Sequence, residues 1–329
     1  MTYKLSYSSI STFEECSEKW RLKYIDKYRS TEINSPLFFG SALDASFEYL
    51  LLGKKHELTE DELTLLTTKS VYDVFDLAMN VQDGNTLPDN PNCVYFASDF
   101  DPDLLTIANL AELKKYDGDI TDYFLFFSQC RELIKAKKSL PLADQRLHNL
   151  MCWMSLYNKG IMMIDQYKQD IIPQIREVYA IQKNVLMENA SGDLVRGKID
   201  FVCSFEDDPN TKYIVDNKTS SEPYAADSVA NSLQLAIYCE SEKIDMAAYV
   251  VAEKKLRKKD PRVRVNIIKG KVSEESFNAA FDKIDKTLYN IHEGNFFKKN
   301  SDRECYSFGR KCEFYKLCWY NNEEGLVKK

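Results

Sequence analysis

The second half of the chain carries the pattern that most limits how it can fold. From residue 175 onward, apolar residues recur mainly with the period of strands, and two stretches have the period of a helix. Strands are expected at residues 175–188, 194–204, 212–219, 245–253 and 262–269, and helices at 226–240 and 274–292. Hairpins make neighbouring strands antiparallel, whereas a helix between two strands of one sheet makes them parallel. The predicted fold class is therefore α/β, with a mixed central β-sheet flanked by helices.

The first half reads as mostly helical. We expect one helix over the first 28 residues and a second over residues 43–52. The pattern stays largely helical up to residue 170, with no resemblance to a known domain. The predicted division is residues 1–53 as N-terminal helices, 54–170 as a large helical insertion, 171–292 as the core, and 293–329 as a cysteine-rich tail.

Composition limits the class of protein. No apolar run reaches the roughly 20 residues needed to cross a bilayer, and the N-terminus lacks the apolar core of a signal peptide. A cytoplasmic protein without a membrane partner is expected, in which the nine cysteines are thiols or metal ligands rather than disulfides. The net charge of −7 argues against non-specific coating of nucleic acid, but it leaves room for a local basic groove.

Basic residues gather in the turn between the last two predicted strands, where Asp260 is their single acidic neighbour. Such a cluster can contact phosphates, and a solvated hairpin is the alternative. The candidates for DNA binding are Lys254, Lys255, Arg257, Lys258 and Lys259.

Two acids and a lysine stand on neighbouring predicted strands. Because side chains alternate along a strand, Asp216 and Lys218 project to one side, and Asp200 can reach the same side. Carboxylates are the hard ligands that Mg²⁺ and Mn²⁺ prefer, and the backbone carbonyl of Asn217 can add another. Lys218 can orient the attacking water or stabilise charge in the transition state. The set suits metal-assisted hydrolysis of a phosphodiester. A solvated strand face is the alternative, since acid-x-Lys is common in a chain that is 29% charged.

These residues carry a family resemblance. Gly-Lys-Ile-Asp200 followed by Asp216-Asn-Lys218 resembles the PD-(D/E)XK nuclease core, with Asp in place of the commoner Glu. The resemblance implies a restriction-endonuclease-like fold. The downstream Gln-x-x-x-Tyr motif resembles that of the RecB-like branch, which implies that Gln234 and Tyr238 border the active site and touch the nucleic acid.

Two N-terminal segments extend the resemblance. Residues 5–16 resemble the opening helix of RecB-like and AddB-like nucleases, and residues 39–44 resemble the next motif, in which a His often ligates metal. Asp44 takes that place here, and its carboxylate is also a hard ligand. Glu177, at the head of the first core strand, resembles another acid of the family and is a further candidate.

The tail cysteines form a second constellation, with the spacing Cys305-x6-Cys312-x5-Cys318. Sulfur is the soft ligand of zinc and of iron–sulfur clusters, and three cysteines leave one coordination position open. Buried thiols or a zinc site are the alternatives to a cluster. In iron–sulfur members of this family one early cysteine joins three near the C-terminus, so the resemblance implies that Cys16 completes a structural [4Fe–4S] cluster. The family commonly spaces the three as Cys-x2-Cys-x5-Cys, and the first gap here is longer.

The resemblance, which covers residues 1–53 and 171–329, implies a Mg²⁺- or Mn²⁺-dependent DNA nuclease. We expect an exonuclease on single-stranded DNA or DNA ends, because no element for reading base edges stands out. Protein partners in recombination, repair, CRISPR adaptation or phage DNA metabolism are compatible with this chemistry. The alternatives are a non-catalytic DNA-binding or scaffolding subunit of a recombination or repair complex, and a zinc-stapled interaction module with incidental acids.

Overall fold

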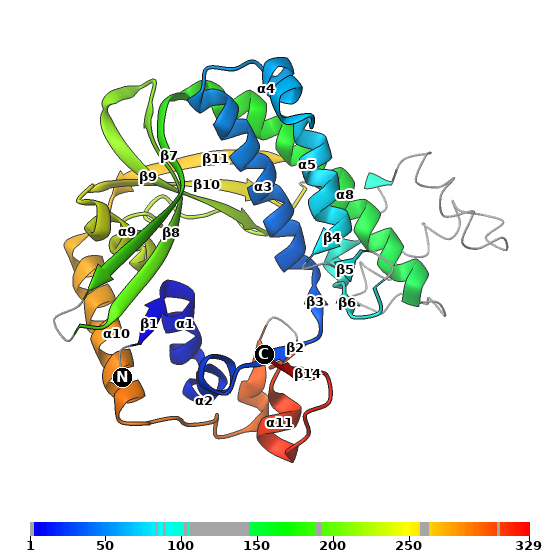
Figure 1. Cartoon of the computed structure of the whole chain (residues 1–329), viewed down its shortest axis with the longest axis vertical. Coiled ribbons are helices and arrows are strands. Elements are labelled where there is room, and N and C mark those ends of the chain that lie inside the picture. Colours follow the sequence, from blue (N-terminus) through cyan, green and yellow to red (C-terminus); the bar gives the residue numbers. More distant parts are fainter. Residues whose placement is uncertain are drawn as a thin grey trace.

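A mixed sheet forms the centre of the molecule (Figure 1). The computed structural model describes residues 3–82, 85–87, 90–101, 104–105, 145–188, 192–256, 263–307 and 310–329. Within these ranges the sheet has six strands in the order β1-β8-β9-β10-β11, with β7 paired to β8. They are β1 (Lys4–Ser6), β7 (Ile175–Glu188), β8 (Leu194–Phe205), β9 (Asp208–Ser220), β10 (Met246–Glu253) and β11 (Arg264–Lys271). The predicted α/β class with a mixed, helix-flanked sheet is confirmed.

Strand direction follows the connections. The hairpins β7–β8, β8–β9 and β10–β11 are antiparallel. Strand β10 runs parallel to β9, because α9 (Leu233–Glu242) carries the chain back between them. The N-terminal strand β1 also pairs in parallel, with the start of β8.

The sheet splits beside β8. Its first residues, Leu194–Arg196, pair with β1, whereas pairing with β9 begins only at Phe201. In the described pairings, residues 197–200 therefore have β7 on one side and neither β1 nor β9 on the other. The alternation of faces also changes here, because Ile199 and Val202 pack in the same core although they are an odd number of positions, three, apart along the strand. This split places Asp200 at an open edge.

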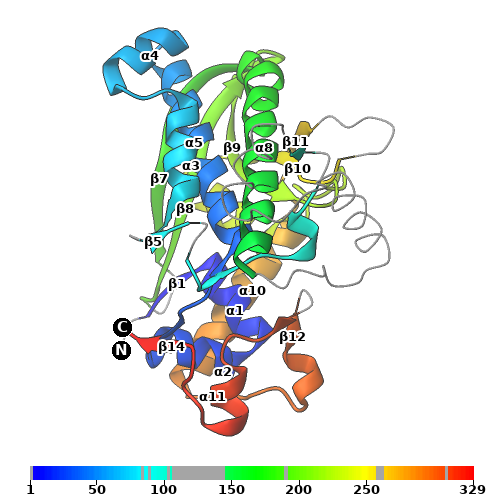
Figure 2. The same ribbon diagram turned by 90° about the vertical axis from the view of Figure 1, so that its right-hand side faces the viewer.

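Helices cover both faces of the sheet (Figures 1 and 2). On one face, α3 (Ser35–Lys55), α5 (Val71–Asn80) and α8 (Gln145–Asp170) bury a core that includes Val215. On the other, α1 (Tyr7–Glu15), α9 and α10 (Glu274–His292) bury a core that includes Ile214. Neighbouring residues of β9 thus enter different cores, and so Asp216 and Lys218 face α9 whereas Asn217 faces α8.

The N-terminal prediction of one helix over 28 residues is wrong. The chain forms β1, α1, α2 (Ser17–Trp20) and a π-helical turn, η1 (Arg21–Ile25). Helix α1 starts early because the Ser6 hydroxyl accepts the Ser9 N–H, and it ends because Cys16 is extended. The second helix is longer than expected, since α3 spans Ser35–Lys55. Helix α9 begins later than expected, at the Ser232 cap.

The remaining elements are short. The tail contains η5 (Asp302–Cys305), β12 (Tyr306–Ser307), β13 (Arg310–Lys311), α11 (Tyr315–Tyr320) and β14 (Leu326–Lys328). Figure 2 shows this tail below α1 and α2, and β14 pairs with β2 (Tyr28–Ser30). Between α3 and β7 lie α4 (Glu60–Thr67), β4 (Val81–Gln82), β5 (Asn85–Thr86), β6 (Cys93–Val94), η2 (Ala97–Asp99) and η4 (Ile172–Gln174), and β6 pairs with β3 (Ile33–Asn34). Residues 106–144 of the predicted insertion lie outside the described ranges. Among the helices described, none combines the length and apolar character needed to span a membrane.

Candidate active site

Asp216, Lys218 and Gln234 form one hydrogen-bonded unit between β9 and α9. The Lys218 ammonium pairs with Asp216 Oδ2 and donates to Gln234 Oε1 (3.0 Å). Gln234 Nε2 in turn donates to Asp216 Oδ1 (2.9 Å) and to the Tyr238 hydroxyl (3.1 Å). Helical spacing explains the last contact, because residues four apart share a face. Gln234 therefore holds the acid, the lysine and the tyrosine in fixed relative positions.

Asp200 bridges the split in the sheet. Its Oδ2 accepts the backbone N–H of Asn217 at 2.7 Å, so a side chain replaces the ladder bond that β8 and β9 would otherwise form there. The side chain of Asn217 points to the opposite face, where its Oδ1 accepts the Tyr167 hydroxyl of α8 (3.4 Å). Asp200 and Asp216 are thereby brought to one place from adjacent strands.

Asp44 approaches the same place from α3. Gln182 Nε2 on β7 donates to Asp44 Oδ2 at 3.4 Å. Gln182 lies between the Ile181–Phe201 and Lys183–Ile199 pairs, and its φ of 49° is in the left-handed region. A non-glycine residue there costs about 1 kcal/mol or more, and such backbone strain gathers at functional sites. The strained residue thus faces the stretch of β8 where Asp200 stands.

The three carboxylates disfavour one another's charge. Burial, followed by the charges of Asp216 and Asp44, raises the pKa of Asp200 to about 8. Burial also raises the pKa of Asp216 and of Asp44 above the ordinary aspartate value. Burial alone would lower the pKa of Lys218, but the Asp216 carboxylate outweighs it and keeps the ammonium protonated. Without metal, Asp200 therefore keeps its proton at neutral pH, and the cluster disfavours further negative charge until a cation binds.

A cavity of about 370 Å³, the candidate catalytic cavity, connects these groups. Its lining includes all three carboxylates and Lys218, together with Gly40, Leu43, Phe47, Lys198, Asn217, Thr219 and Gln234. Asp216 Oδ2 is buried, and the Lys218 ammonium is its charged partner. In this arrangement no three His, Cys, Asp or Glu side chains of the described ranges converge as a preformed metal cage. The three carboxylates around one cavity are nevertheless the oxygen donors that a hard divalent cation prefers, and they would turn toward such an ion.

The model of the PD-(D/E)XK nuclease superfamily matches residues 4–79 and 162–319 of this chain. The chain belongs to this superfamily. No curated protein matches it at a significant level. Eleven chains of known structure match, and one of them, the crystal structure of SSO0001, is 11% identical. That match covers 64% of this chain and 93% of the other with a TM-score of 0.31, a likeness too low to support an argument. The family confirms a metal-dependent nuclease in general, and such nucleases typically use Mg²⁺ or Mn²⁺.

Close packing against Tyr238 explains why position 197 of the nuclease is a glycine. A Cβ atom on Gly197 would stand 2.4 Å from Tyr238 Cε1 and 3.0 Å from Val185 Cγ2. Because both of these side chains are buried, glycine at this position lets Tyr238 lie directly against β8. The sequence pattern alone identified Gly197 only as part of a motif.

Glu177 stands apart from this site. It is exposed on β7 opposite Ser204, at the end of the β7–β8 hairpin that is away from the turn. It lines neither the cavity of the three carboxylates nor the cavity that adjoins it. The predicted role of the Asn217 carbonyl as a metal ligand stays a prediction.

The lysines of the predicted basic turn have different surroundings in the nuclease. Lys254 is half-buried, with its ammonium 5.7 Å from the centroid of the Phe39 ring, and burial lowers its pKa. Lys255 is exposed and pairs with Glu222 at 2.7 Å. Arg257, Lys258 and Lys259 lie outside the described residues. Neither described lysine lines the catalytic cavity.

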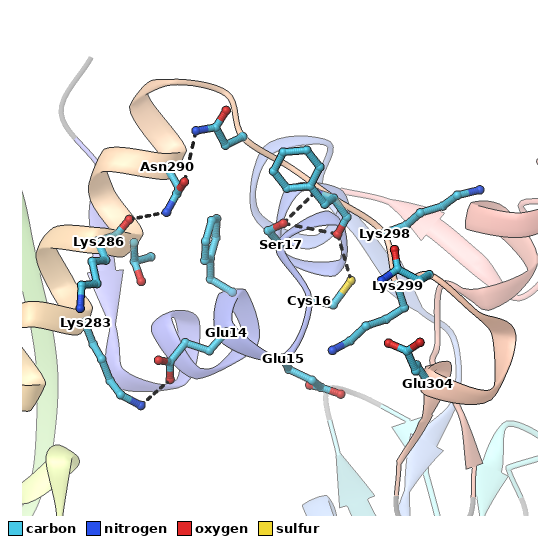
Figure 3. A pocket seen from close by; sticks show the side chains of 15 residues that line it. Glu14, Glu15, Cys16, Ser17, Lys283, Lys286, Asn290, Lys298, Lys299 and Glu304 are labelled. Atoms are coloured by element: carbon cyan, nitrogen blue, oxygen red, sulfur yellow. Dashed lines mark hydrogen bonds and ion pairs between the residues drawn. The ribbon is translucent and has the colours of Figure 1, made fainter.

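The four predicted cluster cysteines lie in one region, although no three of them converge as a preformed metal site in the part of the chain that the structure describes. Cys16, Cys305 and Cys312 line a single cavity of about 400 Å³. Burial raises the pKa of Cys318 to about 12, and the nearby Glu18 and the other three cysteines add to the shift. The Cys312 N–H donates to the Cys305 carbonyl at 2.7 Å. Figure 3 shows Cys16 at the wall of an adjoining cavity, where its thiol donates to the Phe297 carbonyl (3.7 Å) near Lys299 and Glu304.

Sequence reasoning missed several residues around the catalytic cavity. Gln182 gave no signal, because its left-handed backbone occurs at a glutamine inside a strand and not at Gly, Asn or Asp. Lys198 lay inside a quoted motif but received no role, although it lines the cavity. Its alternation with Ile199 on β8 could have marked it as a solvent-facing cation.

Proposed function

We propose that this chain is a Mg²⁺- or Mn²⁺-dependent deoxyribonuclease that acts as an exonuclease on single-stranded DNA or DNA ends. The observation that carries the proposal is the buried Asp216–Lys218–Gln234 unit, which opens into a cavity shared with Asp200 and Asp44. A structural role alone does not account for three carboxylates with raised pKa values around one cavity.

Asp44, Asp200 and Asp216 would hold the cation. When bound, a divalent ion lowers the pKa of a coordinated water and neutralises charge on the phosphoryl oxygens. Lys218 supplies a permanent positive charge beside the reacting phosphate, because its ion pair with Asp216 keeps it protonated. Gln234 and Tyr238 keep Lys218 and Asp216 from turning away. Burial of the unit by α9 lowers the local dielectric, which strengthens each of these interactions.

The preference for single strands or ends rests on the size of the site. The catalytic cavity is small, and it lies in the split of the sheet beneath α3 and α9 rather than on a broad face. A duplex needs an interface of roughly 1,000 Å² or more of protein surface, whereas one strand can enter a narrow groove.

We also propose that Cys16, Cys305, Cys312 and Cys318 hold a [4Fe–4S] cluster, with Zn²⁺ as the competing occupant. The cavity shared by Cys16, Cys305 and Cys312, and the influence of their charges on Cys318, support a common ligand, and the cluster would join α1 to the tail. Purified protein that contains about four iron and four sulfide per chain supports the cluster, and stoichiometric zinc without iron overturns it.

The nuclease proposal is tested by degradation of end-labelled single-stranded DNA with Mg²⁺ or Mn²⁺. Asp216→Asn and Lys218→Met should each lower the cleavage rate by on the order of 10³-fold or more. Lys212→Met is the matched control, because Lys212 stands on the same strand, β9, and away from the cavity. Equal cleavage by wild type and Asp216→Asn contradicts the proposal. Substrates blocked at the 5′ or 3′ end, and a circular substrate, separate exonuclease from endonuclease action.

A further inference from the structure

A second cavity, of about 670 Å³, adjoins the catalytic one. The two share Lys198, Lys218 and Gln234 as a common wall. The second cavity continues away from the carboxylates, between the N-terminal segment, β8 and α9. Its other lining residues are Ser6, Tyr7, Ser8, Ser11, Asn184, Arg196, Gly197 and Tyr238. Its volume lies in the range of ligand sites, about 300–1,000 Å³.

The charges of the two cavities are opposite. The catalytic cavity has three carboxylates, whereas every charged residue that lines the second cavity is a cation: Arg196, Lys198 or Lys218. Hydroxyl groups of the N-terminal segment supply additional hydrogen-bond donors around the cations. Cations and hydroxyls together, without a carboxylate, are the surroundings that bind phosphate groups.

Strand pairing places these groups together. Strand β1 pairs in parallel with β8 so that Ser6 lies opposite Arg196. Arg196 and Lys198 alternate with Val195, Gly197 and Ile199, so the two cations project from one side of β8 about 6.7 Å apart. The same strand leads within two more residues to Asp200. The groove is therefore aligned with the catalytic acids by the backbone itself.

Arg196 and Lys198 are available to a ligand. Both are exposed, and neither side chain forms a hydrogen bond or an ion pair with another residue of the described ranges, although the Lys198 charge acts on Asp44 and Glu48 of α3. Lys183 on β7, by contrast, pairs with Glu242. Arg196 and Lys198 are thus free to bind a phosphate group beside the three carboxylates.

We propose that this groove is a subsite for the DNA strand, in which Arg196 and Lys198 bind the phosphodiester next to the one that is cleaved. The strand would run from the catalytic cavity past Lys218 and along the N-terminal serines. The inference rests on the proposed nuclease function and adds the path of the substrate and two residues that hold it.

Binding of a labelled single-stranded oligonucleotide in the Asp216→Asn background tests the subsite first. Adding Arg196→Gln and Lys198→Gln should weaken binding about tenfold, and the slope of log K against log salt should fall by roughly 0.7 for each phosphate that is no longer neutralised. Arg176→Gln is the matched control, because Arg176 is exposed on β7 near the opposite end of the hairpin. Arg196→Lys should retain most of the affinity. Thermal melting confirms that each variant is folded.

Single-turnover cleavage of oligonucleotides with one methylphosphonate linkage gives the decisive result. Neutralising one linkage beside the cleaved bond should slow the wild type about tenfold but slow the Arg196→Gln/Lys198→Gln variant less than about twofold, because that variant has no cation left to bind the linkage. Independent, multiplicative effects overturn the subsite while leaving the nuclease proposal intact. A wild type that does not cleave DNA overturns both.

Discussion

The fold stabilises the catalytic cleft, which is the cavity between β8 and β9, and the cysteine-rich tail in different ways. In the cleft, Asp200, Asp216 and Lys218 stand on strands of 12 and 13 residues that are covered by helices on both faces. In the tail, Cys305, Cys312 and Cys318 stand on or beside elements of two to six residues, and these three and Cys16, between α1 and α2, are only partly buried. The cleft is organised by the fold before any ligand binds, whereas the tail lacks a core of its own. Ligand binding should therefore affect the chemistry at the first region and stability at the second.

The largest expected effect is on the rate of DNA cleavage, which should depend on the catalytic cleft and not on the tail. Lys218→Met should lower the single-turnover rate by on the order of 10³-fold, about 4 kcal/mol, because it removes a fixed charge beside the phosphate. Cys312→Ser should leave the rate per folded molecule within a few-fold. The measurement is cleavage of labelled single-stranded DNA at a temperature where circular dichroism shows both variants folded. An equal loss of cleavage rate in both variants would contradict the proposed difference between the two regions.

The next effect concerns stability. Cys312→Ser should lower the free energy of unfolding by on the order of 3 kcal/mol, since losing a bound metal group is among the costliest single changes. Lys218→Met should cost much less. Thermal melting measures both, and removal of iron by a chelator should bring the wild type down to the melting temperature of Cys312→Ser. No change on chelation contradicts a structural cluster.

A smaller effect arises from the raised pKa of Asp200. Without metal, the folded state keeps this proton up to about pH 8, whereas the unfolded chain loses it near the ordinary aspartate value. The folded state binds more protons in that window, so stability falls as pH rises through it. Asp200→Asn should remove this slope and be more stable than wild type by on the order of 2 kcal/mol at pH 8 without metal. Denaturant unfolding from pH 5 to 8 measures the difference, and parallel curves for the two proteins contradict it.

The smallest effect tests what else holds the tail. Arg310 on β13 pairs with Glu32 at 2.7 Å and also donates to Asn34, so it ties the tail to β3 independently of sulfur. The pair is partly exposed, and Arg310→Gln should cost only about 0.5 kcal/mol. A melting shift as large as that of Cys312→Ser would mean that ordinary contacts, rather than a cluster, secure the tail.

The same contrast explains what the sequence could predict. The two-residue period of β9 was enough to set Asp216 and Lys218 on one face, and the four-residue spacing of Gln234 and Tyr238 set them on one side of α9. The irregular features had no such signal. The split of the sheet at residues 197–200 depends on where β1 and β9 stop pairing, which is a tertiary property. The break at Cys16 was missed because a single extended residue interrupts an otherwise helical pattern.

Calorimetric titration of Mn²⁺ tests the central claim most directly. We predict that the wild type and folded Cys312→Ser bind Mn²⁺ with similar affinity, and that Asp216→Asn loses this binding while its cysteines and tail remain unchanged. Binding of Mn²⁺ by Asp216→Asn with wild-type affinity would contradict the assignment of the cleft between β8 and β9 as the metal-dependent active site.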